Sequence, residues 1–259
     1  MNLLEKEMLE VLKVLKNDYG VFEIKAEFEA EGSRMEELMR LKDLTSSVGL
    51  PIILKIGGAE AVTDIYNALS IGVKGIIAPM IETSYALYKY LKMIETMIAE
   101  DNAQDIDFAF NIETITACLN LVEMFELPEI KLLTGVTIGR VDLAGSMRID
   151  RKDINTSELI LLNCQSVFIQ ARSKGLKTGL GGAISKEALE PISILTKDNL
   201  LDKFETRKVV FPAEAWRFGE EAIKKAVEFE LLWLKSKRRY YSRIKEEDEK
   251  RIEMLEARK

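Results

Sequence analysis

Short apolar runs rich in β-branched residues alternate with longer amphipathic segments along most of this chain. This alternation limits the fold more than any other feature, because strands followed by helices are typical of βα units around a parallel sheet. Seven runs have the pattern of strands, at 22–29, 52–56, 75–81, 108–112, 131–138, 177–180 and 208–211. Helical patterns fall at 34–48, 59–71, 84–100, 115–126, 156–174 and 186–196.

The number of units and the size of the chain favour a closed barrel. A length of 259 residues with 47% apolar residues matches one (β/α)₈ barrel. We predict an α/β fold of this TIM-type class, with an N-terminal helix and the barrel over residues 1–213. The eighth strand is not evident: either the segment from Asp18 to Phe22 supplies it or the barrel is incomplete, and a doubly wound open sheet is the alternative. No GxGxxG or P-loop motif supports a nucleotide-binding fold.

The end of the chain has a different character. Residues 214–259 run almost without a helix breaker, apolar as far as Leu232 and heavily charged from Lys235 onward. This pattern predicts a long helix or a helical pair as a second unit. We expect it to pack on the barrel or on a neighbouring subunit, and we therefore expect a homo-oligomer.

Charge and composition narrow the classes of partner. The net charge is −6, from 43 acidic and 37 basic residues, so no basic field attracts nucleic acid or an anionic membrane. The first 18 residues are too charged for a secretory signal, and no apolar run approaches the roughly 18 residues that span a bilayer. The two cysteines, Cys118 and Cys164, form no close-spaced ligand pair. We expect a cytoplasmic protein that binds a small molecule.

Histidine is absent from the chain. This excludes the Ser-His-Asp triad and every imidazole metal site, and it removes the commonest general base. Acid–base chemistry must therefore use carboxylates, lysines, tyrosines or water.

Charged residues at strand ends are the first candidates for a site, because catalytic groups in α/β barrels lie at the carboxyl ends of the strands. Period-two alternation places Lys25, Glu27, Glu29 and Glu31 on one face of the first strand. An exposed strand face and a polar site both explain this pattern, and the sequence leaves the two open. Lys55 ends the second strand and is a candidate anion-binding cation.

Two acidic residues end successive strands later in the chain. Glu113 follows Phe110-Asn111-Ile112, and Asp142 follows Val136 to Val141. Two such carboxylates can converge on one hard cation and leave its other positions to substrate oxygens and water, which suits Mg²⁺ or Mn²⁺. The sequence therefore predicts Glu113 and Asp142 as metal ligands.

These stretches also resemble the HpcH/HpaI aldolase and citrate lyase β-subunit superfamily. Ile112-Glu113-Thr114 is similar to the family's IET motif, residues 138–146 are similar to its IGxxDLxxS motif, and residues 75–83 look like its GIIxPxVET strand. The order is preserved and the resemblance covers about residues 22–212. It implies a (β/α)₈ barrel in which Glu113 and Asp142 bind Mg²⁺ or Mn²⁺, and the metal binds the oxygens of a 2-keto acid.

The chain departs from the family pattern at several positions. The family's aldolases use a histidine base near an early strand, where this chain has the charged face that includes Lys25 and Glu27, so we expect these two residues and Lys55 to be catalytic. Lys55 also stands where the family offers an arginine to the substrate carboxylate. Arg140 lies where the family loop is often proline or alanine, and either contacts the substrate with Gly139 or partly blocks the site.

Three functions are compatible with these features. The first is a metal-dependent carbon–carbon lyase or aldolase that acts on a 2-keto acid or related carboxylate through a metal-stabilised enolate. The second is a barrel without catalysis that binds a ligand or serves in assembly, suggested by the absent histidine and the charged C-terminal helix. The third is a phosphoenolpyruvate-using enzyme, suggested by the same metal pair and the glycine-rich loop at 178–185.

Overall fold

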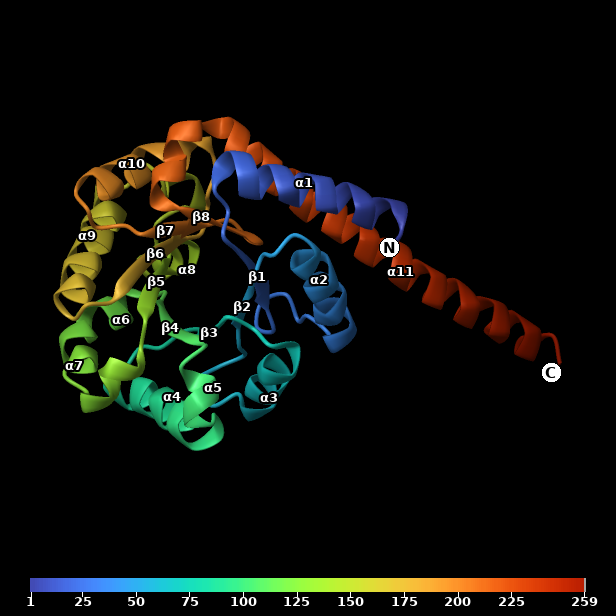
Figure 1. Ribbon diagram of the computed structural model, residues 1–259, viewed down its shortest axis with the longest axis horizontal. Helices are drawn as coiled ribbons and strands as arrows, with labels where there is room; N and C mark the ends of the chain where they lie inside the picture. The colour runs from blue at the N-terminus through green and yellow to red at the C-terminus, as the bar shows by residue number, and fades with distance from the viewer. Residues whose placement is uncertain (259) are drawn as a thin grey trace.

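The computed structural model describes residues 1–258 and contains a closed eight-stranded barrel with helices around it (Figure 1). The strands follow each other around the barrel in chain order. They are β1 (Glu23–Glu27), β2 (Ile52–Lys55), β3 (Gly75–Ala78), β4 (Asp107–Ile112), β5 (Gly135–Gly139), β6 (Lys177–Gly181), β7 (Lys203–Glu205) and β8 (Val209–Pro212). The predicted TIM-type barrel is confirmed, and the open-sheet alternative is wrong.

The last strand departs from the regular topology. Strands β1 to β7 run parallel to one another, whereas β8 pairs antiparallel with both β7 and β1. The strand that sequence analysis missed is β7, not the segment from Asp18 to Phe22, since Asp18 belongs to the first helix. β7 escapes notice because it has only three residues, of which Lys203 and Glu205 are charged. Residues 206–208 join β7 to β8 as a hairpin at the carboxyl end of the barrel.

An outer layer of helices surrounds the strands (Figure 1). They are α1 (Leu3–Tyr19), α2 (Met35–Ser47), α3 (Val62–Ile71), α4 (Ser84–Met97), α5 (Glu100–Ala103), α6 (Ile115–Leu119), α7 (Leu121–Phe125), α8 (Arg140–Ser146), α9 (Glu158–Ser173), α10 (Leu189–Lys197) and α11 (Glu220–Glu256). Four 3₁₀ turns lie between them: η1 (Pro128–Leu132), η2 (Arg151–Asp153), η3 (Lys186–Ala188) and η4 (Ala213–Phe218). Because η1 takes up residues 128–132, β5 starts later than the predicted strand at 131–138. Within residues 1–258, no helix combines the length and the apolar character needed to cross a membrane.

The two faces of the barrel strands differ in chemistry. Outward-facing side chains such as Ile24, Leu54 and Ile76 are fully buried in the main core between strands and helices. Inside the barrel, Ile53, Ile77 and Val210 form a separate small apolar cluster. Toward the carboxyl ends of the strands, the interior side chains are charged or polar. The small apolar cluster therefore separates this polar region from the opposite end of the barrel.

Helix α11 takes the place of the last outer helix but runs in the opposite direction. Since β8 is antiparallel, it ends at the amino end of the barrel, and α11 runs from there along α1 toward the carboxyl end (Figure 1). Near that end, Lys237 and Tyr241 contact the carboxylate of Glu37 at 2.8 and 2.6 Å. Residues 242–258 are exposed, and the helix projects away from the barrel. Packing of this segment on a neighbouring subunit stays a prediction.

The barrel has no room for a side chain at Gly135. A Cβ atom there would lie 2.7 Å from the backbone carbonyl oxygen of Lys177 on the neighbouring strand β6. We expect Gly135→Ala to lower the free energy of unfolding by about 1–3 kcal/mol, because the backbone of two strands must move apart. Urea unfolding followed by circular dichroism measures this change.

Gly145 provides the matched control, because a Cβ atom there meets nothing within 4 Å. It lies in helix α8, where alanine is favoured over glycine by up to about 1 kcal/mol, so Gly145→Ala is expected to be neutral or stabilising. Equal unfolding midpoints for the two variants would contradict the predicted clash.

Candidate active site at the carboxyl end of the barrel

A pocket of about 480 Å³ lies at the carboxyl ends of the strands. It is lined by side chains from the barrel interior, the β7–β8 hairpin, the loop after β6 and helix α11. Of the residues predicted from the sequence, the lining includes Lys25, Glu27, Lys55, Glu113, Gly139 and Asp142, and it does not include Arg140. The structure therefore brings together six of the seven.

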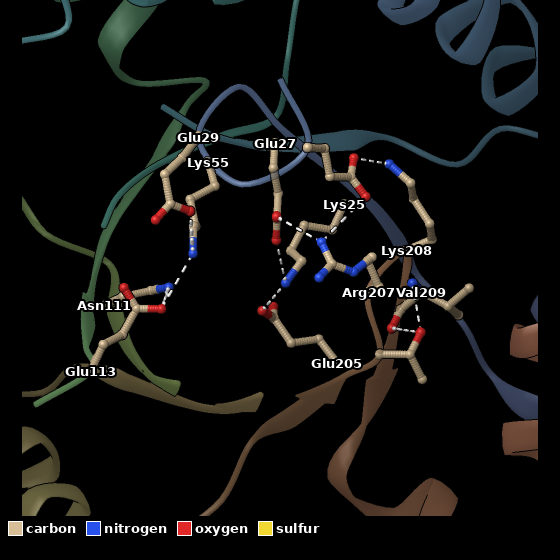
Figure 2. Close-up of polar contacts among 12 residues, drawn as sticks. Lys25, Glu27, Glu29, Lys55, Asn111, Glu113, Glu205, Arg207, Lys208 and Val209 are labelled. Atoms are coloured by element: carbon tan, nitrogen blue, oxygen red, sulfur yellow. Dashed lines mark hydrogen bonds and ion pairs between the residues drawn. The ribbon is translucent and has the colours of Figure 1, made fainter. Parts of the chain in front are cut away.

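Lys25 forms the centre of a buried ion-pair cluster on the floor of this pocket. Its Nζ atom lies 2.7 Å from Glu205 Oε1 and 3.1 Å from Glu27 Oε1, and Figure 2 shows it between these two carboxylates. Burial opposes the charge of Lys25, but the attraction of Glu205 and Glu27 outweighs burial, so the pKa of Lys25 lies above its ordinary value. Burial is likewise outweighed at Glu27, where Lys25 and Lys55 lower the pKa. Both residues are therefore held in their charged forms.

Lys55 connects the loop after β1 to the residue that follows β4. Its ammonium lies 2.8 Å from Glu29 Oε2 and 3.3 Å from Glu113 Oε1 (Figure 2). Burial disfavours the charge, but Glu113 and Glu29 outweigh this effect and the pKa of Lys55 is raised. Lys55 is thus a cation whose partners are both carboxylates of the pocket.

Glu113 is fixed in the pocket by three donors. Its Oε1 atom accepts from Lys55 and from Asn111 Nδ2 at 3.1 Å, and its Oε2 atom accepts from the backbone N–H of Met80 at 3.1 Å. Gly139 leaves the space for this side chain, because a Cβ atom there would lie 2.5 Å from Glu113 Oε1. The glycine of the IGxxDL motif therefore serves to accommodate the glutamate of the IET motif.

Asp142 lies in the first turn of α8 and is exposed at the rim of the same pocket. In residues 1–258 it has no hydrogen bond or ion pair, and Oε2 of Glu113 has only one donor, so both carboxylates have oxygen lone pairs to offer a hard cation. The described residues contain no group of three or more Asp, Glu, Cys or His side chains placed for a metal ion. The two carboxylates supply oxygen donors of the kind that Mg²⁺ or Mn²⁺ takes, and a cation held by them would need water and substrate oxygens as its remaining ligands.

Two buried polar atoms in the pocket have no partner among the described residues. They are Oδ1 of Asn111 and Oε2 of Glu205. Buried polar groups are nearly always hydrogen-bonded, so these two atoms mark places where a ligand or water completes the site. Sequence analysis did not select either residue. Asn111 could have been found from its position two residues before Glu113, which places both side chains on the same side of the strand. Glu205 was missed together with strand β7.

Arg140 points away from the pocket. It is 1% exposed, and its guanidinium donates to Gly181 O at 3.4 Å, Gly182 O at 2.7 Å and Asn155 Oδ1 at 2.8 Å. It lines a different cavity, behind the barrel near α9 and α10, where burial lowers the pKa of Arg140 to about 10. The expected contact between Arg140 and the substrate is therefore not part of this geometry, and neither is obstruction of the site. Arg140 instead holds the loop after β6 against the start of α8.

The β7–β8 hairpin adds a second charged cluster beside the floor. Arg207 lies 3.6 Å from Glu27 and 3.9 Å from Glu31, and Lys208 forms an ion pair with Glu31. Figure 2 shows Arg207 and Lys208 next to the Lys25 cluster. Of the predicted charged face, Lys25 and Glu27 are buried and face the barrel interior, whereas Glu29 and Glu31 lie beyond the end of β1, and Glu29 is exposed. Basic residues from β1, β2 and the hairpin pair with these carboxylates.

Comparisons with known proteins agree with this architecture. A family model described as HpcH/HpaI aldolase/citrate lyase matches residues 34–181, more than half of the chain. No curated protein sequence gives a significant match. Among solved structures, the fold is similar to that of citrate synthase SbnG, with 16% identity, a TM-score of 0.62, and coverage of 79% of this chain and 82% of that one.

Two further solved structures carry the family description. An HpcH/HpaI aldolase from Desulfitobacterium hafniense is 13% identical with a TM-score of 0.63, covering 80% of this chain and 83% of that one. An HpcH/HpaI aldolase/citrate lyase family protein from Burkholderia cenocepacia is 13% identical with a TM-score of 0.60, covering 88% and 98%. At these identities the structures show a shared fold, and the match of the family model gives the family itself. The chain belongs to the HpcH/HpaI aldolase/citrate lyase family.

Proposed function

We propose that this protein is a divalent-metal-dependent carbon–carbon lyase or aldolase that acts on a 2-keto acid or a related carboxylate through an enolate. The family consists of enzymes of the aldolase and citrate lyase type, which generally depend on a divalent metal ion. The observation that carries the proposal is the convergence of Glu113, Asp142 and Lys55 on one pocket at the carboxyl end of the barrel. Acidic ligands and a cation in one pocket suit an anionic substrate with a keto group.

Glu113 and Asp142 are the residues that would hold the metal, and Mg²⁺ or Mn²⁺ suits their oxygen atoms. When bound there, the ion supplies Lewis-acid stabilisation of the negative charge that develops as a carbon–carbon bond breaks or forms. Asn111 and the backbone N–H of Met80 keep the Glu113 carboxylate in one orientation.

Lys55 is the residue that we assign to the substrate carboxylate. Its raised pKa keeps the ammonium charged at neutral pH. Its present partners are Glu113 and Glu29. A metal ion can replace the ammonium beside Glu113, and a substrate carboxylate can replace these glutamates beside Lys55. Gly139 lines the same pocket beside Glu113, and we assign its backbone to the substrate, while the Glu113 carboxylate fills the space that a side chain at this position would take.

Lys25 and Glu27 have a different role in this proposal. Lys25 is held charged by Glu205 and Glu27, and Glu27 is held charged by Lys25, Lys55 and Arg207, so neither exchanges protons readily near neutral pH. We assign them to the fixed charge pattern of the pocket floor, which orients a ligand and keeps Glu205 Oε2 available as an acceptor. A preorganised set of charges of this kind contributes to catalysis without transferring a proton.

Removal of one charge from the proposed metal pair tests the assignment. We expect Glu113→Gln and Asp142→Asn each to weaken Mn²⁺ binding and to lower pyruvate release from 4-hydroxy-2-keto acids by at least about 100-fold, because each removes one of two protein ligands. Titration of free Mn²⁺ by electron paramagnetic resonance measures binding independently of turnover.

Asp150→Asn is the control, since Asp150 is exposed, lies outside the pocket and, among residues 1–258, pairs with Lys152 alone. Wild-type binding and turnover in both pocket variants would show that the metal assignment is wrong. Release of phosphate from phosphoenolpyruvate, without pyruvate release from the keto acids, would instead indicate a phosphoenolpyruvate-using enzyme.

The ion pair of Lys55 with Glu113 predicts competition between this ammonium and a metal ion. We expect Lys55→Met to tighten Mn²⁺ binding by roughly tenfold, which corresponds to about 1.4 kcal/mol, and to raise KM for the keto acid. Lys55→Arg keeps the charge and is expected to leave Mn²⁺ binding near the wild-type value. Weaker Mn²⁺ binding in a folded Lys55→Met variant would contradict the competition.

A further inference from the structure

Glu230 lies on the face of α11 that closes one side of the pocket. It lines the pocket together with Val227, which is three residues earlier and therefore on the same side of the helix. This placement follows from the antiparallel β8, which sends α11 toward the carboxyl end of the barrel instead of away from it. Residue 230 lies outside the part of the chain that the family model matches, 34–181.

Glu230 differs from the other carboxylates of the pocket in its partners. Glu27 and Glu205 are paired with Lys25, and Glu29 and Glu113 are paired with Lys55. Glu230 is half-buried, and within residues 1–258 its carboxylate has neither a hydrogen bond nor an ion pair. Asp142 is the other carboxylate without such a contact, but it is exposed and belongs to the proposed metal pair.

The charges that face Glu230 come from three places. Arg207 and Lys208 of the hairpin and Lys25 of β1 favour its ionised form, whereas Glu31, in the loop after β1, disfavours it. Burial is the largest effect, and it raises the pKa of Glu230 above the ordinary value of a glutamate. A carboxyl group with a raised pKa is better suited to general acid–base catalysis than one that a lysine holds ionised, because its pKa is closer to neutral pH.

We propose that Glu230 is the proton carrier of the pocket, the role left open by the absence of histidine. The proposal rests on the lyase function proposed above. In the cleavage direction, the Glu230 carboxylate accepts the proton of the 4-hydroxyl group of a 4-hydroxy-2-keto acid. The O–H electron pair becomes the new carbonyl bond, and the C3–C4 pair becomes the enolate. The Glu230 carboxylic acid then returns the same proton to C3, which gives an aldehyde and the keto acid with no net change in the protein.

Kinetics of Glu230→Gln test this role. We expect kcat for pyruvate release to fall by about 100-fold or more, with KM changed by less than about threefold, because the amide keeps the shape and loses the proton transfer. The acidic limb of the wild-type pH profile is expected to disappear in the variant. Glu228→Gln is the matched control on the same helix, since Glu228 is exposed, pairs with Lys225 and lies outside the pocket.

A second measurement needs no turnover. Carbon-13 NMR of protein labelled at the glutamate Cδ atoms is expected to show one resonance that Glu230→Gln lacks and that titrates above the bulk of the surface glutamates. A Glu230 resonance that titrates with the bulk would overturn the proposal, and so would a Glu230→Gln variant that keeps kcat within about threefold and retains the acidic limb. If the resonance titrates as expected but the wild-type protein releases no pyruvate from any keto acid tested, the lyase function is what fails, and the proton-carrier role fails with it.

Discussion

Charged side chains that are buried inside a closed barrel must be paired, because an unpaired charge there loses its hydration. The first strand directs Glu23, Lys25 and Glu27 into the barrel, and all three are buried. An unpaired charge in such a place costs several kcal/mol, and loss of one partner of a buried pair typically costs about 3–5 kcal/mol. Each of these groups therefore has a partner: Lys203 of β7 for Glu23, Glu205 of β7 for Lys25, and Lys25 of the same strand and Arg207 of the hairpin for Glu27. The charge pattern of β1 thus dictates the charged residues of β7 and the hairpin.

This pairing explains why the last barrel unit departs from the βα repeat. A regular unit would follow β7 with a helix, whereas the hairpin keeps Glu205, Arg207 and Lys208 within four consecutive positions at the carboxyl end, next to β1. The return of the chain as β8 then closes the barrel against β1 and reverses the direction of the final helix. One local change of topology therefore neutralises the floor of the pocket and brings α11 to its rim, where Trp233 covers the ammonium of Lys208 at 5.9 Å from the ring centre.

The sequence predicted the parts of the molecule that depend on local pattern. The barrel class, seven of the strands and most of the helices follow from hydrophobic periodicity, and strand-end position brought Lys55, Glu113 and Asp142 to attention. β7 was missed because three residues with one apolar side chain carry no periodic signal. Pairing across the barrel was equally invisible, since Lys25 and Glu205 are 180 positions apart. Arg140 was misplaced because a residue at the start of a helix can turn to either side of the loop, and here two backbone carbonyls and Asn155 hold it outside the pocket.

The ion pairs inside the barrel also decide which groups keep a constant charge and which can exchange a proton. Lysines between two carboxylates have raised pKa values, and a glutamate between lysines has a lowered one, so the floor of the pocket keeps the same charges across the neutral range. A floor of this kind orients an anionic ligand in the same way at every pH at which the protein works, but it cannot exchange protons. The chain has no histidine, so a group that changes charge near neutral pH must be a carboxyl or ammonium group whose pKa burial has moved toward neutrality. This requires that ion pairs do not offset the effect of burial. Around this pocket, burial moves two pKa values in that direction where the hairpin meets α11: it raises the pKa of Glu230 and lowers that of Lys208. In the roles that we propose, ligand binding and proton exchange are separated in space, with the first on the barrel floor and the second at the rim.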